Sequence, residues 1–322
     1  MELIKIDESE NAIKEEKKIE DKLGIHLKKD NEISTHLANP TRQADRIYEE
    51  FRKPIENDTE RETILSVGSL FFTYPRGKEP VLKGVNCDIK KGERVAILGS
   101  NGAGKSTFFS LITGLISGYS GSIYLKDKEI RDMSRNEIAQ YISFVPQKHE
   151  PMFPFTVKDF IMMGRYSKID AFGNPTKKDI DAVMRAAEET GAIKYIDRPY
   201  NELSGGEIQL AIISRALAQE TEILILDEPN NHLDFKNQFT VFNLICDISK
   251  KRNVTLIMSL HNPNDVLLFS ERAIVFYDGI VAADGLVSEI LNTDLLSEVF
   301  GVNAVCIKQN GYKAFLPHSL SR

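Results

Sequence analysis

The sequence predicts an α/β fold with a mostly parallel central sheet. Short, strongly apolar runs have the length of strands that are buried on both faces of such a sheet. These runs lie at 95–98, 223–226 and 254–259. Segments with helical patterning lie near 156–165, 176–192 and 205–219. Short strands are also predicted at 64–72 and 122–125, and the dipeptides Asp278-Gly279 and Asn310-Gly311 predict two hairpins. A glycine-rich turn directly after the first run is the third observation, and it indicates where a ligand binds.

That turn occupies residues 99–107 and reads Gly-Ser-Asn-Gly-Ala-Gly-Lys-Ser-Thr, which fits the pattern G-x-x-x-x-G-K-[ST] at every fixed position. The glycines let backbone N–H groups point inward at phosphate oxygens, and the helix predicted from Phe108 to Thr113 adds its positive end. We therefore predict a P-loop that binds a nucleoside triphosphate. Lys105 would reach the β- and γ-phosphates, and the Ser106 hydroxyl would hold Mg²⁺. The predicted nucleotide-binding residues here are Gly99, Ser100, Asn101, Gly102, Ala103, Gly104, Lys105, Ser106 and Thr107.

Two acidic residues follow the second apolar run. Asp227 and Glu228 come directly after 223–226, so we expect them at the carboxyl end of a buried strand. Ligands of open α/β sheets bind at that edge. An aspartate there suits Mg²⁺, and a carboxylate one residue further on can orient or deprotonate an attacking water. Acidic residues commonly follow strands, so this pair alone would not indicate a function. Because a phosphate loop is also present, we predict that the pair takes part in nucleotide hydrolysis.

Two adjacent glycines begin the helix predicted at 205–219. They belong to Leu-Ser-Gly-Gly-Glu at 203–207, where Ser204 and Glu207 have the spacing of a capping box. A capping box explains the serine and the glutamate by structure alone. It does not require Gly205 and Gly206, which indicate a backbone that closely approaches a group such as a phosphate.

With these motifs the chain resembles the nucleotide-binding subunits of ATP-binding-cassette (ABC) transporters. The stretch at 203–207 is similar to that family's signature motif, and the family's other motifs follow in order over about 65–317. The resemblance implies that Tyr74 stacks on adenine and that His261 senses the γ-phosphate. It also implies that Asn231-His232-Leu233-Asp234 contacts an opposite subunit. Taken alone, Tyr74, Gln147 and His261 each have a plainer structural explanation.

The resemblance implies a full set of site residues for ATP and Mg²⁺. The implied catalytic residues are Lys105, Gln147, Glu228 and His261. The implied metal ligands are Ser106, Gln147 and Asp227. Outside the phosphate loop, the implied nucleotide contacts are Tyr74, Ser204, Gly205, Gly206 and Asp234.

The same resemblance implies the domain organisation and the partners. Residues 63–317 would form an ABC ATPase domain with an antiparallel β subdomain, an inserted helical subdomain at about 149–220, and a C-terminal helix and hairpin at about 287–317. Two copies would close head-to-tail on two ATP molecules, with Ser204 and Gly206 touching the nucleotide of the other copy. The expected partners are polytopic permease subunits and, indirectly, an extracytoplasmic substrate-binding protein.

Residues 1–62 differ from the rest in composition. They hold 12 Lys and Arg against 17 Asp and Glu, which accounts for most of the net charge of −6. We expect a charged, weakly ordered extension, with an amphipathic helix at about 42–53 as the alternative. No apolar run approaches the ~18 residues of a membrane span, and the chain starts without an apolar signal segment. No basic face favours nucleic acid. These observations predict a protein that stays in the cytoplasm, and the resemblance implies that it is attached peripherally to the cytoplasmic face of the cell membrane through its partner.

Several stretches are most similar to importers of iron chelates (siderophores or haem) and cobalamin. They are Phe153-Pro154-Phe155-Thr156-Val157, Met162-Met163-Gly164-Arg165-Tyr166, Arg198-Pro199 and the segment 295–301. An importer of another substrate, such as a metal ion or an oxyanion, is an alternative. A soluble ABC ATPase that acts on ribosomes or DNA, or a non-hydrolysing interaction module, is a weaker one. No residue here specifies the cargo, because the cargo does not touch this subunit.

Overall fold

The computed structural model describes residues 61–147, 155–169, 173–229, 233–309 and 311–320. The extension up to residue 60, with its possible helix at about 42–53, lies outside the described residues. So do Asn231 and His232 of the predicted subunit-contact loop. Within the described ranges, no helix combines the length and the apolar character needed to span a bilayer.

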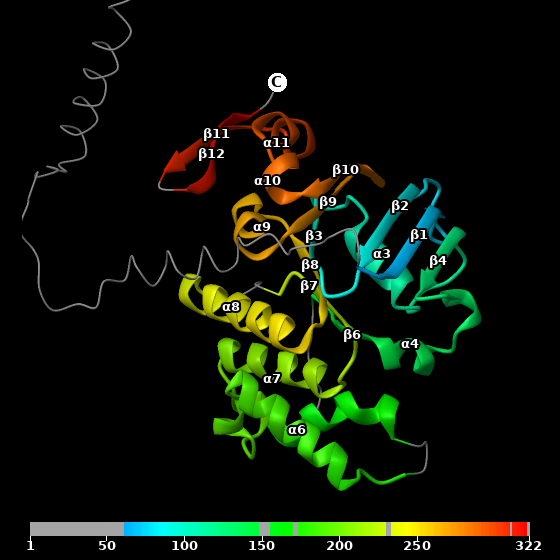
Figure 1. Ribbon diagram of the computed structural model, residues 1–322, viewed down its shortest axis with the longest axis vertical. Helices are drawn as coiled ribbons and strands as arrows, with labels where there is room; N and C mark the ends of the chain where they lie inside the picture. Colours follow the sequence, from blue (N-terminus) through cyan, green and yellow to red (C-terminus); the bar gives the residue numbers. More distant parts are fainter. Residues whose placement is uncertain (1–60, 148–154, 170–172, 230–232, 310, 321–322) are drawn as a thin grey trace, which may run out of the picture. The chain divides into compact units, whose positions relative to one another are not determined.

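The largest sheet has six strands in the order β10-β9-β3-β8-β7-β6 (Figure 1). Every neighbouring pair is parallel except β10 with β9. The strands are β3 (Arg94–Leu98), β6 (Ile142–Val145), β7 (Ile223–Asp227), β8 (Thr255–Leu260), β9 (Arg272–Tyr277) and β10 (Ile280–Leu286). The predicted apolar runs are β3, β7 and β8, and every residue of these strands is buried. The mostly parallel sheet is therefore confirmed.

The two faces of this sheet pack against different layers because side chains alternate along each strand. Val95 and Ile225 belong to the apolar cluster that includes helix α3 (Lys105–Ile112). Leu98 and Leu226, each next to the carboxyl end of its strand, belong to the cluster on the other face. The helices of that second cluster include α7 (Gly205–Ala218), α8 (Phe235–Arg252) and α9 (Pro263–Phe269).

A second, antiparallel sheet shares the apolar cluster of α3 (Figure 1). Its strands, in spatial order, are β2 (Leu82–Lys90), β1 (Thr63–Phe72), β4 (Ser120–Leu125) and β5 (Lys128–Glu129). The predicted strands at 64–72 and 122–125 are confirmed as β1 and β4. A short 3₁₀ turn, η2 (Ile130–Asp132), and helix α4 (Arg135–Tyr141) connect this sheet to β6.

Helices predominate between β6 and β7, as the patterning predicts. They are α5 (Val157–Met162), α6 (Lys177–Thr190) and α7, with 3₁₀ segments η3 (Met163–Lys168), η4 (Ala192–Tyr195) and η5 (Tyr200–Glu202). The rings of Phe160 and Tyr200 lie 4.4 Å apart between centroids. Gly164 packs so closely on α7 that a Cβ atom there would overlap the carbonyl oxygen of Arg215. The extent of this subdomain, about 149–220, remains a prediction.

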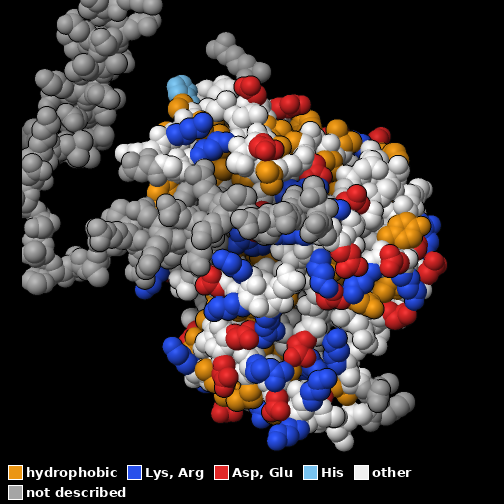
Figure 2. Space-filling model, in the orientation of Figure 1, with side chains coloured by type: hydrophobic (Ala, Val, Ile, Leu, Met, Phe, Trp, Pro, Cys, Tyr) orange, Lys and Arg blue, Asp and Glu red, His pale blue; other side chains and the backbone are white. Residues whose placement is uncertain are grey.

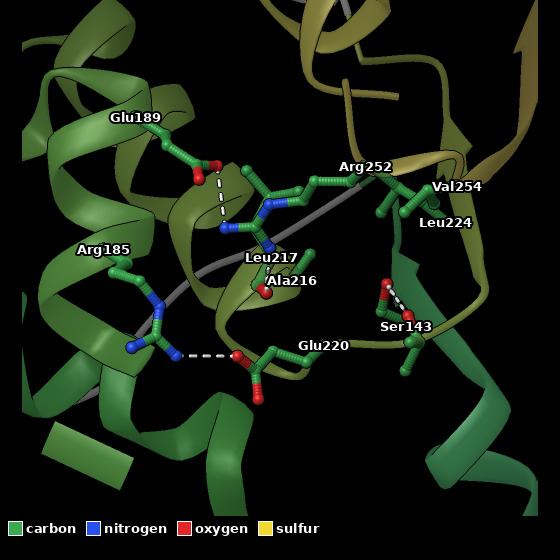
Figure 3. Close-up of a pocket in the computed structure, with 10 residues that line it drawn as sticks. Ser143, Arg185, Glu189, Ala216, Leu217, Glu220, Leu224, Arg252 and Val254 are labelled. Atoms are coloured by element: carbon green, nitrogen blue, oxygen red, sulfur yellow. Dashed lines mark hydrogen bonds and ion pairs between the residues drawn. The ribbon is translucent and has the colours of Figure 1, made fainter. Parts of the chain in front are cut away.

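A pocket of about 390 Å³ lies where these helices meet the amino-terminal ends of β6 and β7 (Figure 3). Two ion pairs line it. Arg185 Nη2 lies 2.9 Å from Glu220 Oε1, and Arg252 Nη2 lies 2.7 Å from Glu189 Oε2. The second pair joins the end of α8 to α6. The pocket is at the opposite ends of the strands from Asp227, and so it is separate from the predicted nucleotide site.

The last part of the chain forms two hairpins, both anticipated from their turn residues. Asp278 and Gly279 join β9 to β10 with φ values of 44° and 82°, as a two-residue turn of type I′ requires. The second hairpin pairs Val302–Gln309 with Tyr312–Leu320, and it ends three residues beyond the predicted end of the domain at 317. The elements here are α10 (Val287–Ile290), α11 (Thr293–Phe300), β11 (Val302–Gln309) and β12 (Tyr312–Leu320).

Basic and acidic side chains are interspersed on the face drawn in Figure 2. Surface ion pairs such as Lys83–Asp278 and Lys128–Glu137 accompany this mixture. A face with both signs of charge does not create the strong single-sign field that attracts a polyanion.

Candidate nucleotide site

The phosphate loop leaves the carboxyl end of β3 and enters α3, as predicted. Gly102 and Gly104 have φ values of 82° and 102°, a backbone region that residues with a Cβ atom rarely adopt. Lys105 Nζ donates to the carbonyl oxygens of Gly99, at 2.8 Å, and Ser100, at 3.1 Å. The loop is therefore folded around the lysine that is predicted to bind phosphate.

The Lys105 ammonium group is buried and lies near two carboxylates. Burial lowers its pKa, while the negative charges of Glu228 and Asp227 act in the opposite direction. The lysine that follows β3 therefore interacts electrostatically with the two acids at the end of β7. A phosphate group that displaced the carbonyl partners of Lys105 would favour the charged lysine further.

The acidic pair stands at the carboxyl end of β7, where the sequence places it. Asp227 is 4% exposed, and its Oδ1 accepts a hydrogen bond from the Ser259 hydroxyl at 2.5 Å. Glu228 has a φ of 49° and its N–H donates to the same hydroxyl oxygen at 2.8 Å. One serine on β8 therefore contacts both the predicted metal ligand Asp227 and the predicted catalytic residue Glu228.

Gln147 follows β6 and contacts Glu228 from the neighbouring strand. Its Nε2 donates to Glu228 Oε2 at 2.6 Å. Because the amide nitrogen makes this bond, the amide oxygen of Gln147 keeps its capacity to accept. The structure therefore brings together a glutamine and a glutamate that are both predicted to be catalytic.

Tyr74 lies beside the phosphate loop, although it is far from it in sequence. Its hydroxyl is 3.1 Å from Thr107 Oγ1, and its ring packs edge-on against Phe72 with centroids 4.9 Å apart. The side chain is 44% exposed. An aromatic face thus remains open near the loop, and its stacking on adenine stays a prediction.

The glycine pair lies in the first turn of α7. The predicted capping box is present, because the N–H and the hydroxyl of Ser204 both lie 2.8 Å from Glu207 Oε2. Gly206 faces the side chain of Asn237, at the start of α8. Within the described ranges, no hydrogen bond joins this turn to the phosphate loop of the same chain. The capping box explains Ser204 and Glu207 locally, and the predicted contact of this turn with a nucleotide stays a prediction.

Asp234 and His261 lie at neighbouring connections. Asp234 caps α8, where its Oδ1 accepts from the Asn237 N–H at 2.8 Å. His261 directly follows β8 and is exposed. Burial raises the pKa of Asp265, and the charge of His261 opposes that rise. The predicted roles of Asp234 and His261 stay predictions.

Ser259 is the site residue that the motifs did not indicate. The sequence carried one signal, a serine near the end of the apolar strand Thr255-Leu256-Ile257-Met258-Ser259-Leu260. A fully buried hydroxyl must find a hydrogen-bond partner. That signal does not name the partners, because they lie on a strand some thirty residues earlier in the chain.

The residues at this edge fit a nucleotide with a divalent cation. Ser106, Gln147 and Asp227 offer hydroxyl, amide and carboxylate oxygens, the kind of ligand that Mg²⁺ takes beside phosphate oxygens. Ser106 is exposed in the first turn of α3, and its hydroxyl can therefore face a ligand. The glycine-lined loop supplies backbone N–H groups for the phosphates.

Comparison with known proteins identifies the family. A family model described as ABC transporter matches residues 82–231. An ABC transporter ATP-binding protein of Methanocaldococcus jannaschii is 37% identical over 79% of this chain and 98% of the relative. The chain belongs to the ABC transporter family. As an ABC ATPase it hydrolyses ATP, and its relatives include subunits of importers.

The names of some other ABC relatives state what they import. The iron(3+)-hydroxamate import ATP-binding protein FhuC of Bacillus subtilis is 34% identical over 74% of this chain and 88% of the relative. The molybdate import ATP-binding protein MolC of Haemophilus influenzae is 34% identical over 66% of this chain and 78% of the relative.

Solved ABC structures share the fold. A metal-chelate type ABC transporter in an inward-facing conformation is 30% identical, with a TM-score of 0.70 over 80% of this chain and 98% of the other. A dimeric ATP-binding cassette in a post-hydrolysis state with ADP and phosphate is 26% identical, with a TM-score of 0.61 over 69% and 98%. The predicted P-loop α/β fold is confirmed.

Proposed function

We propose that the chain energises import of an iron chelate, such as a siderophore or haem, or of cobalamin. The observation that carries the ATPase part is the meeting of Lys105, Gln147, Asp227 and Glu228 at one sheet edge. The similarity to the hydroxamate importer supports the cargo class. The chain would act on the cytoplasmic face of the membrane, bound to permease subunits, with an extracytoplasmic binding protein as an indirect partner.

Each proposed residue has a defined task in hydrolysis. Lys105 binds the β- and γ-phosphates once these replace the loop carbonyls, and Tyr74 holds the adenine by stacking. Glu228, oriented by Gln147, takes a proton from the water that attacks the γ-phosphate. Mg²⁺, held by Ser106, Asp227 and Gln147, would neutralise charge on the phosphates. His261, which follows β8, donates a hydrogen bond to the γ-phosphate.

We propose that a second copy completes the site. Ser204 and Gly206 lie at the N-terminus of α7, a position suited to phosphate, but they are not bonded to the loop of their own chain. Nearby, Phe235 follows Asp234 and is 87% exposed. This aromatic side chain lies in the first turn of α8, near the first turn of α7 that contains Ser204 and Gly206. We expect such an exposed apolar surface to be covered when two copies close.

Phe235→Ala is expected to weaken the ATP-bound dimer. Burying a phenylalanine stabilises by about 1.5–3 kcal/mol, and a dimer of two copies would bury two of them, so the dissociation constant of the variant should be at least about a hundredfold higher. The measurement is the monomer–dimer equilibrium by analytical ultracentrifugation, in a Glu228→Gln background that retains ATP. ATP binding by the monomer should not change, because Phe235 is outside the phosphate loop.

A tryptophan at the same position reports burial directly. The chain has no tryptophan, so Phe235→Trp supplies the sole indole emission. Addition of ATP should shift that emission to shorter wavelength and reduce quenching by iodide. Tyr166→Trp, at a residue that is 64% exposed in η3, is the matched control and should not respond to dimer formation. A dimer that forms without any change at position 235 would place Phe235 outside the interface.

Affinity capture from native membranes, followed by mass spectrometry, tests the importer proposal. A multi-spanning permease should copurify, and its gene deletion should abolish uptake of one radiolabelled chelate. The similarity to the molybdate importer makes an oxyanion the second candidate, and uptake of molybdate is therefore measured in parallel. Recovery of ribosomal proteins or DNA-repair factors without a permease would contradict the importer proposal and leave the ATPase in place.

A further inference from the structure

One buried hydroxyl connects the two acids of the proposed site. Ser259 is 0% exposed, and its Oγ makes two short contacts. It donates to Asp227 Oδ1 at 2.5 Å and accepts from the backbone N–H of Glu228 at 2.8 Å. The two acids are at the carboxyl end of β7, whereas Ser259 is on β8, about thirty residues later in the chain.

The register of the central sheet produces this arrangement. Strands β7 and β8 are parallel, and Asp227 is the Cα partner of Ser259. Side chains at paired positions lie on the same face of a sheet, so the hydroxyl reaches the carboxylate directly. The next peptide N–H, that of Glu228, would continue the ladder in a regular strand. Instead the backbone turns, and the serine hydroxyl takes the place of a backbone acceptor.

The turn at Glu228 is an unfavourable one. Its φ of 49° lies in the left-handed region, and the following residue is Pro229, which favours extended backbone at position 228. Such backbone persists where the surroundings fix it. The bond from the Glu228 N–H to Ser259 and the bond from Gln147 to the Glu228 carboxylate both hold this residue in place.

We propose that Ser259 is a positioning residue for ATP hydrolysis. It fixes Asp227 through one carboxylate oxygen, which leaves the other oxygen as an acceptor, and it fixes the backbone from which the Glu228 side chain projects. Both acids thereby keep one relative position. This inference rests on the proposed roles of Asp227 as a metal ligand and Glu228 as the base.

Ser259→Ala and Ser259→Thr test the proposal as a pair. Alanine removes the hydroxyl, whereas threonine keeps it and adds one methyl group. We expect alanine to lower kcat by about tenfold or more, because hydrogen bonds to charged groups are the strong ones. Threonine should restore most of the activity. Ser249→Ala is the matched control, since this buried serine of α8 donates only to the Val254 carbonyl, at 2.6 Å.

A second readout does not depend on turnover. Mn²⁺ binding to the protein with a non-hydrolysable ATP analogue is measured by electron paramagnetic resonance. The alanine variant should bind Mn²⁺ several-fold more weakly, while its affinity for the analogue without metal stays unchanged. A loss of activity with wild-type Mn²⁺ affinity and a lowered melting temperature, also seen in Ser249→Ala, would reduce Ser259 to a packing residue and overturn the proposal.

The proposed role of Glu228 as the base and the proposed positioning role of Ser259 can be tested separately. If Glu228→Gln retains full turnover, the proposed role of Glu228 is wrong, whatever Ser259 does. If Glu228→Gln is inactive while Ser259→Ala hydrolyses ATP at the wild-type rate and Mg²⁺ requirement, only the positioning role is wrong.

Discussion

Glu228→Gln is expected to bind ATP as the unaltered chain does and to hydrolyse it at least about a hundredfold more slowly. The substitution keeps the shape and size of the side chain but removes the basic carboxylate that is proposed to accept a proton from water, a contribution of typically 10²–10⁴-fold. The phosphate loop and Lys105 are untouched. Single-turnover hydrolysis and equilibrium binding of a fluorescent ATP analogue measure the two quantities.

The neighbouring residue Gln147 provides the control for this substitution. In the structure its Nε2 donates to Glu228 Oε2, and a glutamine at 228 can still accept that bond through its own amide oxygen. The site therefore keeps its geometry while it loses the base. Gln147→Ala keeps the base but loses its orientation, and we expect a smaller loss of turnover. Steady-state hydrolysis by Glu228→Gln at the unaltered rate would show that another group accepts the proton.

The parts of the fold that the sequence predicted are those that local patterns determine. The wholly buried strands β7 and β8 are recognisable because a parallel sheet covered on both faces needs uninterrupted apolar runs. The turn at Asp278-Gly279 is recognisable because two successive positive φ values favour this dipeptide. Both signals lie within a few residues of the structure they specify.

Strand β2 and helix α8 were not predicted, because they lack such local signals. Strand β2 contains Gly84 and Asn86, two poor strand formers, and depends on pairing with β1 for its conformation. Helix α8 begins with Phe235 and also exposes Phe239, which is 43% exposed, so its apolar pattern does not mark one face. Tertiary contacts, rather than periodicity, decide these segments.

The candidate site divides in the same way. Lys105, Asp227 and Glu228 belong to motifs whose spacing carries their chemistry, and the structure places them at one edge. Ser259 was missed because its role depends on the register of β7 against β8, which no short motif encodes. The proposed contact of Ser204 with a second copy depends on an interface between chains, and one chain alone does not contain that information.

Arg165→Ala is expected to destabilise the helices between β6 and β7 by about 3–5 kcal/mol, because it breaks a buried ion pair on one side only. Arg165 is 2% exposed and makes three contacts. Its Nε donates to Asp179 Oδ1 at 3.0 Å, and its Nη1 donates to the Ala218 carbonyl at 2.7 Å and to Glu220 Oε2 at 2.8 Å. Arg165 thus links η3 to α6 and to the C-terminal end of α7.

The pKa of Asp179 gives this prediction a pH dependence. Hydrogen bonds from the hydroxyl and N–H of Thr176, and then the Arg165 guanidinium, lower it to about 2 from an ordinary 3.8. A carboxyl group whose pKa is lower in the folded state stabilises the fold above pH 4 and loses that contribution as the pH falls toward 2. Without Arg165 the pKa of Asp179 in the folded state should lie closer to 3.8, so this contribution to stability is smaller and its loss is complete at a higher pH. Urea denaturation between pH 3 and pH 7 measures both effects.

Arg185→Ala is the matched control, because Arg185 pairs with the same Glu220 from a position where its side chain is 51% exposed (Figure 3). Exposed pairs contribute about 0–1 kcal/mol, so this variant should remain near the stability of the unaltered chain. Arg165→Lys keeps the charge but loses the planar fork that reaches three acceptors, and it should fall between the two. If Arg165→Ala and Arg185→Ala cost the same, the burial of Arg165 does not determine its contribution, and α7 is held to its neighbours mainly by its apolar cluster, which includes Phe160, Val183 and Ile212.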